Sequence, residues 1–175
     1  MKEFQTFLKN NNLNKFDIES KMYECFLLNI FEKLVNHLSI EDNLLSFKKH
    51  LRKSNDIQEE LSIYEMFLNQ IIEINLTNSE LLFIKKLIDA YLRKNTIRIT
   101  LSDFEKEQIL KLQNYKCNIC MNNILLTTTH IDHKIAFKYV GDELTENYQA
   151  LCEKCNLSKG ANLFYFFDSL LPKKY

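Results

Sequence analysis

The sequence predicts an α+β protein in which an all-α region, residues 1–98, precedes a small module, residues 99–175, held together by cysteines. The 175 residues include only two Gly and one Pro, which favours long uninterrupted helices over a turn-rich β architecture. Four of the five cysteines fall in two Cys-x-x-Cys pairs within the last third of the chain. The hydrophobic fraction of 46% is typical of a globular protein and too high for general disorder.

Apolar residues recur at three-to-four spacing through the N-terminal region, and this period predicts amphipathic helices. The expected helices span about 16–38, 41–53 and 57–75, with a fourth that follows a cap at Thr77 or Asn78. Their apolar faces are sufficient to form the core of a helical bundle.

The C-terminal module is expected to begin after Thr96–Thr100, which alternates like a short strand or a linker. Ser102 and Glu105 form the pattern of a capping box at the start of a helix. The remaining expected elements are that helix at about 103–113, extended stretches at 124–133 and about 135–139, a turn at 141–143 and a helix at about 152–159.

The charge of the chain is balanced in both parts. Residues 1–99 carry 14 basic and 14 acidic side chains, and residues 100–175 carry 9 of each. Proteins that hold DNA strongly by themselves usually have a basic surplus. Nucleic-acid contact would therefore depend on bound metals, on a partner or on local clusters. The best such cluster is 48–53, which is either a phosphate-binding patch or an ordinary solvated helix face.

The sequence does not predict attachment to a membrane. No apolar run approaches the roughly 18 residues that a membrane span needs. The N-terminus lacks the basic-then-apolar pattern of a signal peptide. We therefore expect a soluble cytoplasmic protein.

The two Cys-x-x-Cys pairs, Cys117/Cys120 and Cys152/Cys155, have the spacing of a zinc site. Each pair places two thiolates on one side of a tight turn, and two pairs complete a tetrahedron with no open position. The zinc is therefore expected to be structural. The segment around the pairs has little apolar material of its own, and small modules of this kind commonly need a metal to fold.

Residues between and after the pairs form a second set of candidate functional groups. Asp132 and His133 end an expected strand, Asn147 follows 14 residues later, and Asn156 comes directly after the last cysteine. These motifs resemble the HNH (ββα-metal) endonuclease family, whose hallmark is a strand ending in Asp-His, a central Asn, and a helix with Asn or His after the last zinc cysteine. The resemblance covers about residues 103–162 and implies a ββα-metal module with endonuclease activity.

The same residues suit phosphodiester hydrolysis on chemical grounds. That reaction needs a base to activate water and a cation to stabilise the developing charge. His133 suits the base because an imidazole ordinarily titrates near about pH 6.5. Asp132 and Asn156 offer hard oxygen ligands for a catalytic Mg²⁺ or Mn²⁺.

Three further side chains are candidates for supporting roles. Lys159 stands three residues beyond the helical asparagine, where it could meet a phosphate. His130 shares a strand face with Asp132 and is either a phosphate or metal contact or ordinary strand surface. By the resemblance, Asn147 braces the loop after the Asp-His strand and orients His133.

The chain departs from the family pattern at two places. Met121 replaces the usual Gly after the first cysteine pair, and Ala136-Phe137 stands where a Pro is often found. Neither position supplies a reacting group, so these departures bear on loop shape.

The leading hypothesis is a metal-dependent DNA endonuclease. One alternative is a non-catalytic, zinc-stapled module that binds DNA or protein, and another is a phage or homing endonuclease whose helical region reads the sequence. The neutral charge and the separate helical region suggest a nuclease that another component recruits, as in bacterial restriction or antiviral defence. The helical region would then serve recognition, homodimer formation, or docking of a regulatory or ATPase partner.

Overall fold

The computed structural model describes residues 2–10 and 18–165, which divide into two compact units. The helical unit comprises Phe26–Arg98 and a later segment, Phe137–Thr145. The sheet unit contains Ile99–Ala136 and the described residues from Glu146 onward, with those before Phe26. Helices combined with a two-stranded antiparallel sheet confirm the predicted α+β class.

The N-terminal region is helical, as its apolar spacing predicts. Its helices are α1 (Lys2–Asn10), α2 (Ile18–Leu38), α3 (Glu41–Leu51), α4 (Ile57–Leu68) and α5 (Asn78–Arg93). In the part of the chain that the structure describes, no helix combines the length and apolar character needed to cross a membrane.

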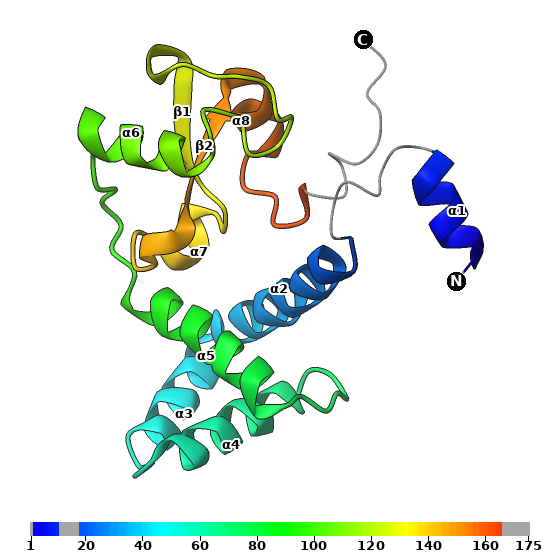
Figure 1. Ribbon diagram of the computed structural model, residues 1–175. Coiled ribbons are helices and arrows are strands. Elements are labelled where there is room, and N and C mark those ends of the chain that lie inside the picture. Colours follow the sequence, from blue (N-terminus) through cyan, green and yellow to red (C-terminus); the bar gives the residue numbers. More distant parts are fainter. Residues whose placement is uncertain (1, 11–17, 166–175) are drawn as a thin grey trace. The chain divides into compact units, whose positions relative to one another are not determined.

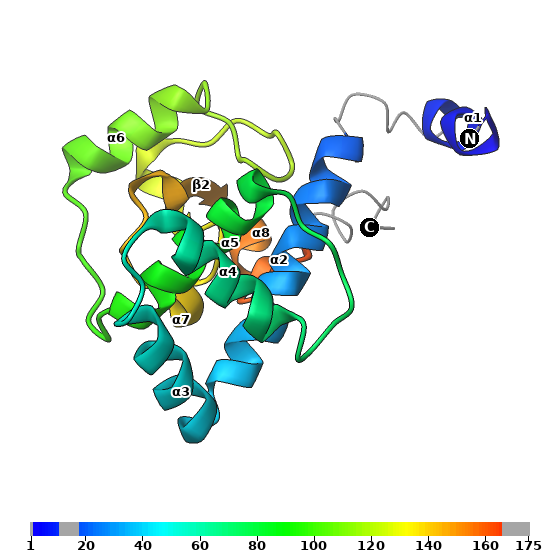
Figure 2. The ribbon, with the colours of Figure 1, turned by 90° about the horizontal axis from the view of Figure 1, so that it is seen from below.

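The core of the helical unit consists of large apolar side chains from α2 to α5, the helices that Figures 1 and 2 show from two sides. Phe47 on α3 is fully buried and meets Tyr64 and Phe67 of α4 edge-on, with ring centroids 5.1 and 5.0 Å away. The other fully buried large side chains of this unit are Phe31, Leu34, Leu38, Tyr64, Leu68, Ile84, Ile88 and Val140.

The boundaries of α4 and α5 show how local chemistry starts and stops a helix. Thr77, one of the two expected caps, begins α5 and forms a reciprocal capping box with Glu80. Helix α4 ends at Leu68, whereas the apolar pattern predicts helix to about residue 75. The backbone amides of Ile71 and Ile72 both donate to the Leu68 carbonyl, at 2.8 and 2.9 Å, so the chain turns there.

Residues 137–145 pack within the helical unit, although they lie far along the chain from its other helices. They begin with the short helix α7 (Phe137–Val140). The Tyr139 hydroxyl donates to the Glu32 carboxylate of α2, and its ring meets Phe31 edge-on at 5.9 Å. Gly141 has a φ of +57°, and a Cβ at that position would lie 2.9 Å from Cβ of Lys94. This turn therefore requires glycine for both backbone conformation and space.

The sheet unit is built around two antiparallel strands, β1 (Thr129–His133) and β2 (Tyr148–Cys152), shown side by side in Figure 1. Helix α6 (Asp103–Leu112) begins at a Ser102–Glu105 capping box, as predicted, and packs against β2. Helix α8 (Glu153–Lys159) follows β2 directly and packs against both strands. Single 3₁₀ turns at Leu126–Thr128 and Thr145–Asn147 precede β1 and β2.

The predicted strand at about 135–139 is wrong. That stretch overlaps α7, and the partner of β1 is 148–152, where the register pairs Asp132 with Gln149 and His133 with Tyr148. Apolar runs this short do not distinguish a strand from a buried helical turn. Residues 96–100 form a linker and not a strand.

Candidate metal centres and active site

Four cysteines converge in the sheet unit. The Sγ atoms of Cys117, Cys120, Cys152 and Cys155 all lie within 4.8 Å of one another, and those of Cys120 and Cys152 are 3.9 Å apart. A tetrahedral zinc with Zn–S bonds of about 2.3 Å requires sulfur atoms about 3.8 Å apart. The four thiols therefore fit a structural zinc ion. Within the described residues, this is the one cluster of three or more His, Cys, Asp or Glu side chains close enough to hold a metal.

The first cysteine pair is held by a tight turn. Cys117 donates its backbone N–H to the Asn122 carbonyl at 2.9 Å, and its own carbonyl accepts from Met121 at 3.0 Å. Met121 has a φ of +62°, in the left-handed region that favours glycine. Met121 therefore adopts a backbone conformation that glycine reaches without strain. For a residue with a side chain, this conformation costs about 1–2 kcal/mol of conformational free energy.

The thiols differ in electrostatic surroundings. Burial, together with neighbouring thiols, raises the pKa of Cys155. Burial also acts to raise the pKa of Cys117, but backbone N–H groups of Cys120, Cys152 and Ile119 outweigh it, and that pKa is lowered. Amide donors that stabilise the Cys117 thiolate also suit a sulfur bound to zinc.

One face of β1 presents the candidate ligands of a catalytic metal. His130 and Asp132 share this face because side chains alternate along a strand. Asn156 of α8 reaches the same face, where its Nδ2 lies 3.5 Å from Nδ1 of His130. Oδ1 of Asp132 accepts no hydrogen bond from any residue that the structure describes. A carboxylate and an amide oxygen on one face are the hard donors that suit Mg²⁺ or Mn²⁺.

His133 is the last residue of β1. Its side chain is only 6% exposed, and its ring lies 4.9 Å from the ring of Tyr148, the residue opposite on β2. Packing against a cross-strand aromatic ring restricts the imidazole to few orientations.

Asn147 closes the loop that joins the two strands. Its Oδ1 accepts from the backbone N–H of Ile135 and its Nδ2 donates to the Ile135 carbonyl, both at 2.8 Å. The Asn147 carbonyl accepts from the backbone N–H of Lys134 at 2.7 Å. Because Asn147 is 4% exposed, these bonds form away from solvent and hold the chain two residues after His133.

Lys159, the last residue of α8, is buried, with an exposed fraction of 5%. Its Nζ lies 2.8 Å from both Oδ2 of Asp132 and the His133 carbonyl, and 3.3 Å from the Gly160 carbonyl. A phosphate contact, expected from the sequence, would require the ammonium group to leave these oxygens.

In a comparison with protein-family models, residues 117–162 match the HNH endonuclease family. Residues 117–162 form an HNH domain. Searches of curated proteins and of solved structures found no match. The domain contains all four cysteines and every candidate site residue predicted from the sequence, which are Asp132, His133, Asn147, Asn156, His130 and Lys159. HNH domains are generally nuclease domains.

Two glutamines of the sheet unit support the HNH site and were missed by sequence reasoning. Gln149 donates from Nε2 to Oδ2 of Asp132 at 3.2 Å. Gln113, just after α6, exchanges hydrogen bonds with the backbone N–H and carbonyl of Ala150, at 2.8 and 2.9 Å. Correct assignment of β2 would have indicated Gln149, since it pairs directly with Asp132.

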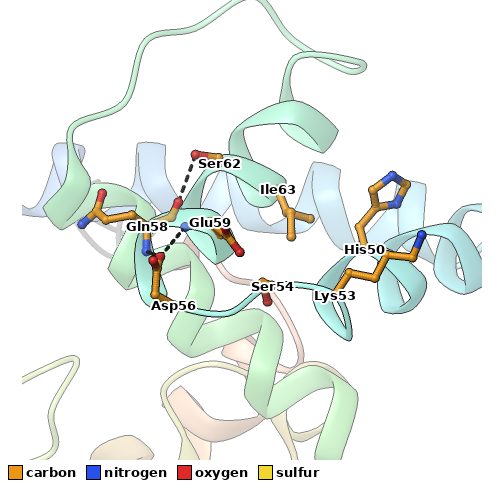
Figure 3. Close-up of a pocket in the computed structure, with 8 residues that line it drawn as sticks. All are labelled: His50, Lys53, Ser54, Asp56, Gln58, Glu59, Ser62 and Ile63. Atoms are coloured by element: carbon orange, nitrogen blue, oxygen red, sulfur yellow. Dashed lines mark hydrogen bonds between the residues drawn. The ribbon is translucent and has the colours of Figure 1, made fainter.

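A concave surface in the helical unit carries no comparable chemistry. Figure 3 shows it at the turn between α3 and α4, where Asp56 accepts from the backbone N–H groups of Gln58 and Glu59, both at 2.9 Å. Its lining also includes His50 and Lys53 from the cluster at 48–53. Asp56 caps α4, and no metal-binding cluster lies here among the described residues, so the catalytic candidates remain those of the HNH domain.

Proposed function

We propose that this protein is a metal-dependent DNA endonuclease whose HNH domain hydrolyses phosphodiester bonds with one catalytic Mg²⁺ or Mn²⁺. The observation that carries the proposal is the complete set of Asp132, His133, Asn147 and Asn156 inside the matched segment. A module that only binds DNA or protein has no chemical need for a carboxylate, an imidazole and an amide at these positions.

His133 is proposed as the general base. It takes a proton from the attacking water, whose oxygen bonds to phosphorus as the bond from phosphorus to the leaving sugar oxygen breaks. The leaving oxygen takes up a proton from solvent. The contact with Tyr148 and the bonds of Asn147 to the following loop support this role, because both restrict the position of the imidazole. Asn147 is accordingly proposed as a positioning residue.

Asp132 and Asn156 are proposed to hold the catalytic metal. A Mg²⁺ ion bound there would supply a Lewis acid that stabilises charge on the phosphate and on the leaving oxygen. Asp132 would offer Oδ1, since its Oδ2 already accepts from Gln149, and Asn156 of α8 would offer its amide oxygen. His130, which is exposed beside Asn156, is proposed to contact the substrate phosphate.

The balanced charge supports recruitment to DNA by another component. Neither part of the sequence has a basic surplus, so the attraction to phosphate that drives unaided DNA binding is weak. We therefore propose that the protein acts in a bacterial restriction or antiviral defence system. The helical unit would dock a second copy of the chain or a regulatory subunit.

The experiment that tests the nuclease is cleavage of supercoiled plasmid by the full-length protein with Mg²⁺ or Mn²⁺. His133→Ala is expected to lower the cleavage rate by about 10²–10⁴-fold, the usual contribution of a general base. Zinc content and circular dichroism should be unchanged in this variant. The control is Phe26→Ala, which removes a 55% exposed side chain outside the HNH domain and should cleave like the wild type.

Cleavage by His133→Ala at the wild-type rate would exclude His133 as the base. If the wild-type protein binds DNA but does not cut it with either metal, the result would favour a non-catalytic, zinc-stapled module that binds DNA.

A further inference from the structure

Lys159 is the buried cation of the HNH domain. Lysine side chains are almost never fully buried unless they are paired, because removing an ammonium group from water is costly. An exposed fraction of 5% therefore calls for compensating contacts. The other lysine of α8, Lys154, is exposed and provides an internal contrast.

The ammonium group of Lys159 has three oxygen partners, which matches its three N–H donors. Two of them belong to consecutive residues at the end of β1. These are Oδ2 of Asp132 and the backbone carbonyl of His133, each 2.8 Å from Nζ. The third is the carbonyl of Gly160, at 3.3 Å. One side chain thus ties the end of α8 to the two residues proposed as metal ligand and base.

These contacts orient the Asp132 carboxylate. Oδ2 is occupied by Lys159 at 2.8 Å and by Gln149 at 3.2 Å. Oδ1 has no hydrogen-bond partner among the described residues. A carboxylate with one oxygen bound on the protein side can offer only the other oxygen to a cation, in a single orientation.

We propose that Lys159 is a positioning residue that fixes Asp132 as a one-oxygen ligand and holds the backbone of His133 in place. This inference rests on the proposed nuclease function and assigns Lys159 a role different from phosphate binding. A shift of a reacting group by about 1 Å can lower a rate by about a hundredfold, so the contacts of Lys159 affect turnover. The Lys159 side chain itself does not touch the DNA.

The test compares Lys159→Met, Lys159→Arg and the surface control Lys154→Met in the full-length protein. Lys159→Met keeps the length of the side chain but removes its charge and donors. We expect it to retain zinc, to lose at least about tenfold in kcat, and to keep the wild-type KM for DNA. Lys159→Arg should have a kcat between those of Lys159→Met and the wild type, because the larger planar guanidinium fits the three oxygens less well. Lys154→Met should match the wild type.

Two measurements report on the link without cleavage. Titration with Mn²⁺ should show that Lys159→Met binds the ion at least as tightly as the wild type, because a competing positive charge is gone. Amide hydrogen exchange at 133–135 should be faster in Lys159→Met and unchanged in Lys154→Met. If the wild type does not cut DNA, the proposed function fails, and hydrogen exchange at 133–135 still tests whether Lys159 holds the end of β1.

A phosphate-binding lysine would give different results. Its loss would raise KM and lower the salt dependence of DNA binding by about one unit of slope, with kcat unchanged. That outcome, or wild-type exchange at 133–135 in Lys159→Met, overturns the proposal. If Lys159→Met loses zinc, the comparison of Lys159→Arg with the wild type tests the proposal by itself. A lower kcat at unchanged KM supports the link, and a wild-type kcat overturns it.

Discussion

The two units of this protein are stabilised by different means. The helical unit buries large aromatic and aliphatic side chains, including Phe31, Phe47 and Tyr64, which are fully excluded from solvent. The core cluster of the sheet unit comprises Leu110, Cys117, Ile124, Ala150, Leu151 and Cys155. Two of these are candidate zinc ligands and one is alanine, so apolar burial alone contributes much less there. One unit is therefore expected to fold by ordinary packing and the other by metal binding.

Removal of zinc should have the largest effect on stability, and it should affect the two units differently. Structural zinc contributes about 10–16 kcal/mol of apparent binding free energy in small modules at neutral pH. Chelation, or Cys117→Ser, is expected to unfold the sheet unit while α3, α4 and α5 remain folded. Amide hydrogen exchange resolved along the chain measures this directly.

The control for that experiment is Cys25→Ala, which removes a buried thiol of α2 outside the cysteine cluster. It should retain one zinc ion per chain. Unchanged protection of β1 and β2 after complete removal of zinc would contradict the proposed division.

A core substitution in the helical unit should destabilise that unit and leave the zinc site of the sheet unit intact. Phe47→Ala removes a fully buried ring that packs on Tyr64 and Phe67. It is expected to lower the free energy of unfolding by about 3–5 kcal/mol. Zinc should stay bound, because none of the four cysteines belongs to this unit. Denaturant unfolding followed together with zinc content checks both statements.

Phe26→Ala is the matched control, since the Phe26 side chain is 55% exposed and its loss should cost little. Release of zinc together with unfolding of the helical unit would show that the units fold as one.

The smallest expected effect concerns the segment that returns to the helical unit. Tyr139→Phe removes the hydroxyl that donates to Glu32, and should lower the free energy of unfolding by about 1.5–3 kcal/mol, as for hydrogen bonds to charged groups. Burial, with a contribution from Glu32, raises the pKa of Tyr139 to about 12. The protonated phenol is thus favoured in the folded state, and its contribution is lost as pH rises from about 10 to about 12.

Unfolding measured at several alkaline pH values tests this prediction. Tyr139→Phe should show a weaker loss of stability in that pH range than the wild type. An identical pH dependence in both proteins would mean that the hydroxyl does not stabilise the segment.

The sequence by itself determined the features that depend on residues close together in the chain. The capping boxes at Thr77 and Ser102 need only a side chain three residues away, and both are present. The spacing of the cysteine pairs predicted one cluster, and the four Sγ atoms do converge. The Asp-His pair and the asparagines were recognised as an HNH motif, which the family comparison supports.

Tertiary structure decided the features that depend on distant contacts. The partner strand of β1 lies at 148–152 because the register with β1 places Ala150 and Leu151 in the core, whereas 137–145 packs in the helical unit. The surroundings of Lys159 are likewise set by where α8 meets the end of β1. A lysine three residues after an asparagine predicts a shared helix face, but only the packing of that helix against the strand determines whether its charge meets solvent or a carboxylate.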